Sequence, residues 1–273
     1  MGVWWLRVQS LGDAIAALPD RVISAGGTLI KPAIAKDGST GEFVDVSGLR
    51  AMAEIVRTDH ALTIGALVRN QTLIDHPDVK QCAPALAHAA MTIGNPHVRR
   101  AGTIGGNVAC RLARASTPPA LLVYDARLRL AERDGEREVA LAPILTDGVP
   151  AGSLITAVIV PRSAGFHVAF DKLAWRNATA KAIVTAAIAV RLEDGVCSEV
   201  RLAAGGLCVA RRLPRAEARL RGRALDAATI EAAAAIAAAE PPWEVTDVPA
   251  GETYRRRVIG QTIARLLAEV PRG

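Results

Sequence analysis

The stretch that decides the fold is VRRAGTIGGNVA, residues 98–109. An apolar pattern with helical spacing precedes it over residues 84–93. The Gly105-Gly106 pair lets the backbone approach an anionic ligand closely and offers N–H groups to it, and Thr103 and Asn107 add side-chain donors. The segment therefore predicts a diphosphate-binding loop, with an ordinary tight turn as the alternative.

A second glycine-rich segment, Ala25-Gly26-Gly27-Thr28, lies much earlier in the chain. It follows a strand expected over residues 21–24, so a glycine-lined turn lies at the end of a strand, where backbone amides can face a ligand. Two such loops could hold one diphosphate from both sides. Neither segment has the spacing of a P-loop, and neither reads Gly-x-Gly-x-x-Gly after a strand, so both of those nucleotide folds are disfavoured.

The composition limits the classes of protein to which this chain can belong. The chain has 273 residues, of which 51% are hydrophobic, which is enough to fill two domains. Its formal charge of +6 comes from scattered Lys and Arg, so we expect a solvated surface and no nucleic-acid partner. No uncharged apolar run is long enough to span a membrane, and the start lacks the pattern of a secretory signal, so we expect a cytoplasmic protein without a membrane partner.

Neither a metal site nor an acid–base catalytic group stands out. The four cysteines, at positions 82, 110, 197 and 208, form no Cys-x-x-Cys pair, so we expect no metal in this chain. The five histidines are isolated, and no nucleophile with a neighbouring base or paired carboxylates can be recognised. We therefore assign no catalytic residue.

The pattern of elements divides the chain near Phe166. Before it we expect helices over residues 10–19 and 116–125 and a hairpin over residues 127–141. Strands expected over residues 21–24, 42–46 and 61–66 suggest a mixed sheet. After it we expect a half-buried strand with a period of two, its partner strand and two helices, over residues 184–192, 200–204, 227–239 and 252–270.

The segment 98–109 resembles the signature of a known family, the flavin-binding subunits of molybdenum hydroxylases of the xanthine dehydrogenase and carbon monoxide dehydrogenase type. There a VRNxGTIGGN-like segment holds the FAD diphosphate. The resemblance also covers the AGGT loop and residues 43–47, 62–66, 203–206 and 251–256. It implies an α+β fold, with a two-lobed vanillyl-alcohol-oxidase-like (PCMH-type) FAD-binding domain over residues 1–165 and a smaller C-terminal sheet-plus-helices domain over residues 166–273. The lobes would be about 1–58 and 59–165.

The resemblance also implies a function. The chain would bind FAD as the electron-transfer subunit of a molybdenum hydroxylase, take electrons from the [2Fe-2S] clusters of a small partner subunit and pass them to an external acceptor. A large partner subunit would carry molybdopterin, and the complex would be a dimer of heterotrimers. Two alternatives stay open: a self-sufficient flavin oxidase of related fold, and a flavin-free assembly subunit.

By the same resemblance, the two glycine-rich segments would bind the diphosphate, and Ile104 would lie near the flavin ring. The residues of these segments are Ala25, Gly26, Gly27, Thr28, Leu29, Thr103, Ile104, Gly105, Gly106 and Asn107. Replacing Gly105 or Gly106 by valine would then remove FAD with little loss of fold.

The sequence departs from the family at two further candidate positions. Ser116 replaces the aspartate that reaches the sugar hydroxyls of the cofactor, and Lys181, in the segment 176–181, replaces an aromatic residue that screens the ring. A lysine near the flavin N1–C2 edge could stabilise an anionic reduced flavin, and an ordinary surface charge is the alternative. Trp175 is a candidate neighbour of the ring, with a core role as its alternative.

Overall fold

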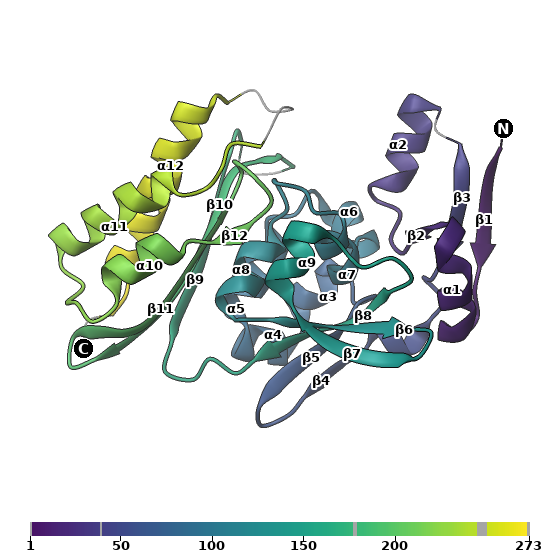
Figure 1. The fold of residues 1–273 in the computed structure, drawn as a ribbon, viewed down its shortest axis with the longest axis horizontal. Helices are drawn as coiled ribbons and strands as arrows, with labels where there is room; N and C mark the ends of the chain where they lie inside the picture. Colours follow the sequence, from purple (N-terminus) through teal and green to yellow (C-terminus); the bar gives the residue numbers. More distant parts are fainter. Residues whose placement is uncertain (1, 39, 177–178, 245–249, 272–273) are drawn as a thin grey trace.

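The computed structural model describes residues 2–38, 40–176, 179–244 and 250–271. Figure 1 shows three sheets in succession along the long axis, each with its own helices. The chain therefore mixes helices and sheets, as predicted. Within the described residues, no helix is long and apolar enough to cross a membrane.

The N-terminal lobe is a small parallel sheet with the strand order β1-β3-β2. Because parallel strands need crossover connections, α1 and the 3-10 turn η1 join β1 to β2, and α2 joins β2 to β3. As predicted, Ser10 caps α1, and its hydroxyl accepts a hydrogen bond from the amide of Asp13 at 3.1 Å. The elements are β1 (Val3–Arg7), α1 (Leu11–Ala17), η1 (Leu18–Asp20), β2 (Val22–Ser24), α2 (Ile30–Asp37) and β3 (Gly41–Asp45).

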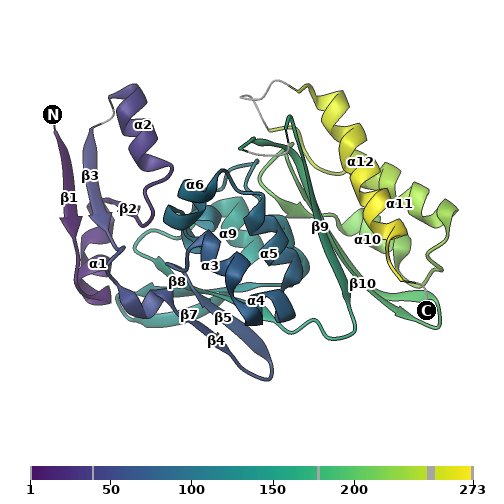
Figure 2. The same ribbon diagram turned by 180° about the vertical axis from the view of Figure 1, so that it is seen from behind.

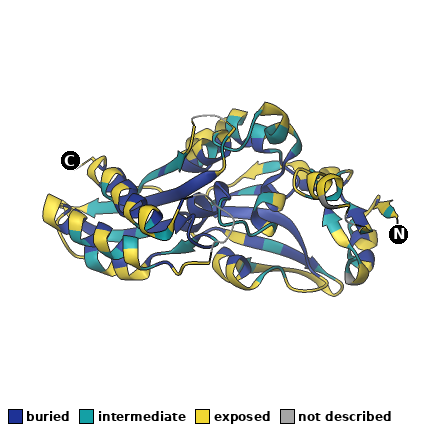
Figure 3. Cartoon of the chain, turned by 90° about the horizontal axis from the view of Figure 1, so that it is seen from above, coloured by how far each residue is buried: buried dark blue, intermediate teal, exposed yellow. Residues whose placement is uncertain are grey.

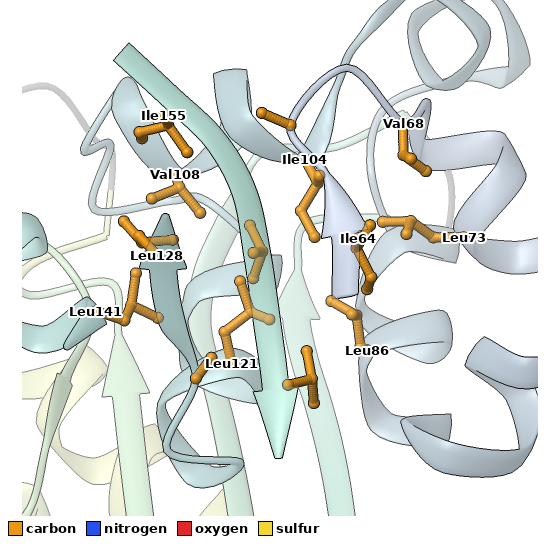
Figure 4. Packing of buried hydrophobic residues seen from close by; sticks show 14 of the residues in the cluster. Ile64, Val68, Leu73, Leu86, Ile104, Val108, Leu121, Leu128, Leu141 and Ile155 are labelled. Carbon is orange, nitrogen blue, oxygen red and sulfur yellow. The ribbon is translucent and has the colours of Figure 1, made fainter. Parts of the chain in front are cut away.

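The second lobe is built on an antiparallel sheet with the strand order β4-β5-β8-β6-β7. Its strands are β4 (Ile55–Arg57), β5 (Ala61–Gly65), β6 (Arg127–Glu132), β7 (Gly135–Ala140) and β8 (Leu154–Pro161). Its helices are η2 (Arg50–Ala53), α3 (Asn70–Asp75), α4 (Pro77–Cys82), α5 (Pro84–Met91), α6 (Pro96–Ala101), α7 (Ile104–Ala109), α8 (Thr117–Val123) and α9 (Leu141–Asp147). Figure 4 shows side chains of β5, α7, β6 and β8 meeting in the core of this lobe, among them Ile64, Ile104, Leu128 and Ile155.

One expectation about these sheets is wrong. The strands at 42–46 and 61–66 lie in separate sheets, because an apolar pattern identifies a strand and not its hydrogen-bonding partner. β4 pairs with β5 in the sheet of the second lobe, and the lobe division at about residue 58 stays a prediction. The predicted hairpin is confirmed as β6 and β7.

The C-terminal domain is an antiparallel sheet with the strand order β12-β11-β10-β9. Its strands are β9 (His167–Ala174), β10 (Ala182–Glu193), β11 (Val196–Gly205) and β12 (Arg211–Arg212). Its helices, α10 (Pro214–Leu220), α11 (Ala227–Ala239) and α12 (Glu252–Ala268), cover one face, as Figures 1 and 2 show from opposite sides. β8 ends at Pro161 and β9 begins at His167, and the domain division at 165/166 stays a prediction.

β10 is buried on both faces, and not half-buried as its alternating pattern predicts. Residues 182–190 are all buried, because α12 packs on one face of the strand and α8 of the second lobe lies against the other. Figure 3 shows this continuous burial along the strands and the exposed residues on the outer helices. The C-terminal sheet is therefore packed between its own helices and the second lobe.

Candidate cofactor site

The loop of residues 25–29 joins β2 to α2 and lies directly against the second lobe. A Cβ atom at Gly26 would lie 2.0 Å from the carbonyl oxygen of Ala101 and 3.0 Å from the Cα of Gly102. Only glycine allows this approach. Since Gly102 immediately precedes Thr103, the structure brings the two glycine-rich segments together from different lobes, as the sequence suggested.

The backbone amides of this loop are available to a ligand. Within the described residues, the N–H groups of Gly26 to Leu29 donate to no protein acceptor, and the first helical hydrogen bond runs from Lys31 to the carbonyl of Gly27 at 3.0 Å. Gly27 has a φ of +65°, which favours glycine. Unpaired amides at the start of the eight-residue helix α2 favour an anion, so the loop fits a diphosphate.

Lys31 is a candidate that the sequence reasoning missed. A Cβ atom at Gly27 would lie 3.0 Å from Cε of Lys31, so the lysine side chain runs alongside the loop. A cation beside unpaired amides strengthens the attraction for a phosphate. The signal in the sequence was its place in the first turn of a helix, but α2 itself was not predicted.

The segment 103–107 is not an open loop but the start of helix α7. Its amides are already used: Ile104 donates to Val68 at 3.0 Å, Gly105 to Ala66 at 2.9 Å, Gly106 to the hydroxyl of Thr103 at 3.1 Å and Asn107 to the carbonyl of Thr103 at 2.9 Å. In this structure the N–H groups of Gly105 and Gly106, which the sequence predicts for the diphosphate, donate to protein acceptors.

The remaining donors of this segment are side chains. Thr103 is 2% exposed, and its hydroxyl accepts from the amide of Gly106 while keeping its own proton to donate. The amide nitrogen of Asn107 is oriented because its Oδ1 accepts from the hydroxyl of Thr117 at 2.6 Å. A role for residues 103–107 in binding the diphosphate stays a prediction, now carried by Thr103 and Asn107.

The two glycines of α7 have different surroundings. A Cβ atom at Gly105 would lie 2.7 Å from the Cβ and 2.8 Å from the carbonyl oxygen of Ala66, whereas at Gly106 it would meet only the hydroxyl of Thr103 at 3.0 Å. We therefore expect valine at Gly105 to disturb the fold, unlike the expectation from the sequence. Ile104 is 0% exposed within the core shown in Figure 4, which leaves its side chain no surface for a flavin ring.

Ser116 lies at the other candidate region, between the second lobe and the C-terminal domain. It is 3% exposed, and its hydroxyl oxygen lies 3.1 Å from the hydroxyl of Thr92 at the end of α5. Its hydroxyl therefore faces another protein hydroxyl, and its contact with the cofactor sugar stays a prediction.

Lys172, on β9, is the second candidate that sequence reasoning missed. Its Nζ donates to the carbonyls of Thr92 at 2.7 Å and Ala180 at 3.0 Å, so one ammonium joins the second lobe to the C-terminal domain. Burial lowers its pKa to about 8. An ammonium has three donors, and within the described part of the chain the third has no acceptor and no carboxylate pairs with it. The sequence signal would have been a lysine inside a strand, but β9 was not predicted.

The remaining candidates lie at the tip of the β9–β10 hairpin. Ala174 pairs with Ala182, so Trp175 directly follows β9 and Lys181 directly precedes β10 at the end of the paired strands. Both are exposed. Asn177 and Ala178, in the segment where the sequence departs from the family, lie outside the described residues. The structure thus groups Ser116, Lys172 and Lys181 around one junction of the two domains.

The space beside the first loop is large enough for part of a small molecule. A cavity of about 580 Å³ lies between β1, β3 and α2, and its wall includes Ser24 and Ala25. Sites of about 300–1,000 Å³ are typical of small-molecule binding. No group of His, Cys, Asp or Glu suited to a metal ion is found among the described residues.

Comparison with known proteins decides the family. Residues 1–163 match the family model described as the FAD binding domain in molybdopterin dehydrogenase, and residues 169–270 match the CO dehydrogenase flavoprotein C-terminal domain. The chain belongs to the FAD-binding subunits of the molybdenum hydroxylases. It is therefore an oxidoreductase component with an FAD-binding domain, and the fold expected from the family resemblance is confirmed.

Relatives within the family cover nearly the whole chain. The 6-hydroxypseudooxynicotine dehydrogenase complex subunit alpha of Paenarthrobacter nicotinovorans is 33% identical over 97% of this chain and 93% of its own. The carbon monoxide dehydrogenase medium chain of Hydrogenophaga pseudoflava is 28% identical over 95% and 93%. Among solved structures, a carbon monoxide dehydrogenase of Hydrogenophaga pseudoflava matches with a TM-score of 0.92 at 26% identity, covering 98% of this chain and 96% of that chain.

Proposed function

We propose that this chain binds one FAD noncovalently and passes electrons from the [2Fe-2S] clusters of a partner subunit to an external acceptor. The observation that carries the proposal is the run of unpaired amides from Gly26 to Leu29, which lies at the contact of the two lobes of an FAD-binding domain. No His or Cys lies within residues 25–29 or 103–107, so these segments offer no side chain for a covalent flavin link.

The residues divide into a diphosphate end and a flavin end. Ala25 to Leu29 would hold the diphosphate, aided by Lys31 and the side chains of Thr103 and Asn107. Ser116, Lys172 and Lys181 would surround the flavin end, where the two domains meet. Bound FAD supplies the redox chemistry that amino-acid side chains lack. The third N–H of Lys172 supplies a donor for an oxygen of the ligand, and a protonated Lys172 favours negative charge there.

The partners follow from the relatives. Matched proteins are named as a complex subunit alpha and as medium chains or medium subunits, so this chain would assemble with other subunits. We propose a large molybdopterin-binding subunit and a small [2Fe-2S] subunit, in a cytoplasmic dimer of heterotrimers. The reducing equivalents would come from these partners. No nucleophile paired with a base can be recognised in residues 25–29 or among Ser116, Lys172 and Lys181.

Two measurements test this proposal. Acid precipitation of the purified chain should release flavin in a one-to-one ratio to protein, and a colourless complex or a flavin that stays with the precipitate would contradict the cofactor assignment. Stopped-flow absorbance at the flavin band should show reduction by substrate in the three-subunit enzyme only. Rapid bleaching of the isolated chain would favour a self-sufficient oxidase, and an unreduced flavin in a turning-over complex would exclude the electron-transfer role.

A further inference from the structure

The cavity of about 580 Å³ lies inside the N-terminal lobe, between helix α2 and one face of the parallel sheet. No residue of the second lobe belongs to its described wall, whereas we place the cofactor where the two lobes meet. The lobe lies at the end of the molecule opposite the C-terminal domain (Figures 1 and 2). The wall consists of Val3, Trp5, Arg7, Ser24, Ala25, Lys31, Ile34, Ala35, Asp45 and Ser47.

Helix α2 packs only loosely over this cavity. None of residues 30–36 is buried. Lys31, Ile34 and Ala35 line the cavity, so one face of the helix is turned toward the sheet across an open space. A helix of eight residues is not stable without packing of such a face. A ligand in the cavity therefore supplies contacts that the helix lacks.

The sheet presents an aromatic surface to the cavity. Trp5 is the partner of Phe43 in the β1–β3 register, and their rings are stacked with centroids 4.8 Å apart. Although Phe43 covers part of the indole, Trp5 remains 41% exposed. Aromatic rings stack on one another with a gain beyond the burial of apolar area. The surface of Trp5 that lines the cavity thus favours a flat aromatic ligand.

The charged side chains in the wall sum to one positive charge. Arg7 pairs with Asp45 at 3.2 Å, and the backbone amide of Ser47 donates to the same carboxylate at 2.9 Å. The remaining charge is the ammonium of Lys31, which lies 5.9 Å from the centroid of the Trp5 ring and pairs with no carboxylate among the described residues. Lys31 therefore favours one anionic group on the ligand, and Asp45 disfavours a second.

A buried hydroxyl in the wall lacks a hydrogen-bond partner. Ser24 is 3% exposed, and in the described part of the chain its hydroxyl neither donates nor accepts a hydrogen bond. Ser24 is the partner of Asp45 in the β2–β3 register, so both side chains lie on the face of the sheet that the cavity covers. An unpaired buried hydroxyl costs free energy, and an oxygen of a ligand satisfies it.

We propose that this cavity is a second ligand site, separate from that of FAD, and that it binds a planar aromatic monocarboxylate. The ring of the ligand stacks on Trp5, and its carboxylate accepts hydrogen bonds from Lys31 and Ser24. The volume lies within the range of small-molecule sites. An ammonium has three donors, so the carboxylate and the diphosphate at the neighbouring loop can share Lys31.

Isothermal titration calorimetry of the FAD-loaded chain tests the proposal with two probes, naphthoate and the neutral naphthamide. Naphthoate should bind in a one-to-one ratio, and naphthamide about tenfold more weakly, because it lacks the charge that pairs with Lys31. Absence of naphthoate binding, or equal affinities for the two probes, would overturn the proposal. Binding to the apoprotein alone would also overturn it, since the cavity would then belong to the cofactor. Naphthoate binding by a chain that takes up no FAD would contradict the proposed cofactor role and still support this site.

Variants locate the site. Trp5→Leu and Lys31→Gln should each weaken naphthoate binding by about tenfold, since they remove the stacking surface or the charge. Lys36→Gln is the matched control, because Lys36 is an exposed lysine of the same helix outside the cavity wall, and its affinity should equal that of the wild type. Circular dichroism and the absorbance spectrum report fold and flavin content separately. If Lys36→Gln weakens binding as much as Lys31→Gln, or if both cavity variants bind like the wild type, the cavity is not the site.

Discussion

Replacing Gly26 by alanine tests whether the contact between the two lobes builds the cofactor site. The new Cβ would lie 2.0 Å from the carbonyl oxygen and 2.8 Å from the carbonyl carbon of Ala101. Cβ atoms essentially never come within 3.0 Å of another heavy atom, so the loop must move by about 1 Å. The obstacle is backbone, which cannot rotate away as a side chain can. Such overpacking costs about 1–3 kcal/mol of folding free energy.

The same movement weakens the binding of FAD. It carries the unpaired amides of Gly26 to Leu29 away from the second lobe, so at least one hydrogen bond to the diphosphate is lost or lengthened. A hydrogen bond to a charged group contributes about 1.5–3 kcal/mol. We therefore expect the dissociation constant of FAD to rise by about tenfold to a hundredfold.

The assay is a titration of apoprotein with FAD, followed by quenching of tryptophan fluorescence. Gly12→Ala is the matched control, because a Cβ atom at Gly12 would meet only the hydroxyl of Ser10 at 3.8 Å, an ordinary contact. The control should bind FAD like the wild type. An unchanged affinity and melting temperature in Gly26→Ala would refute the reasoning, because both depend on the same close approach.

Three further predictions follow from the structure. The pKa of Lys172 in the folded chain is about 8, against an ordinary 10.5, so between these pH values the unfolded chain binds more protons than the folded chain. The free energy of unfolding, measured in urea, should therefore increase as pH rises through this window. Lys172→Met should lack that contribution, and the difference between the two proteins removes the opposite effect of Cys208, whose pKa burial raises to about 11. Gly105→Val should lower the melting temperature strongly, whereas Gly106→Val should keep the circular dichroism spectrum and lose flavin; equal melting temperatures would contradict this. FAD at a hundredfold excess over its dissociation constant should raise the free energy of unfolding by about 2.7 kcal/mol, measured in urea with and without cofactor.

Structural features that depend on neighbouring residues in the sequence could be predicted from the sequence alone. The caps at Ser10 and Asp226 accept hydrogen bonds from amides three residues ahead, as expected. The predicted β6–β7 hairpin forms, with its turn at Arg133 and Asp134, one residue before the expected Asp134-Gly135. The glycine-rich segments and the family signature were enough to indicate the fold and the cofactor. Each of these depends on a few adjacent residues, whose backbone preferences act before any long-range contact forms.

Only the tertiary structure decided how those residues are used. The amides of Ile104 and Gly105 are engaged because Val68 and Ala66, which follow β5, present their carbonyls to α7, and those of Gly106 and Asn107 donate to Thr103. The loop of Gly26 keeps its amides free because it packs edge-on against Ala101. Lys172 became a candidate because the carbonyl of Thr92, 80 residues away in the sequence, meets the carbonyl of Ala180 at its ammonium. Burial and the choice of hydrogen-bonding partner are properties of segments that lie far apart in sequence, so no local pattern contains them.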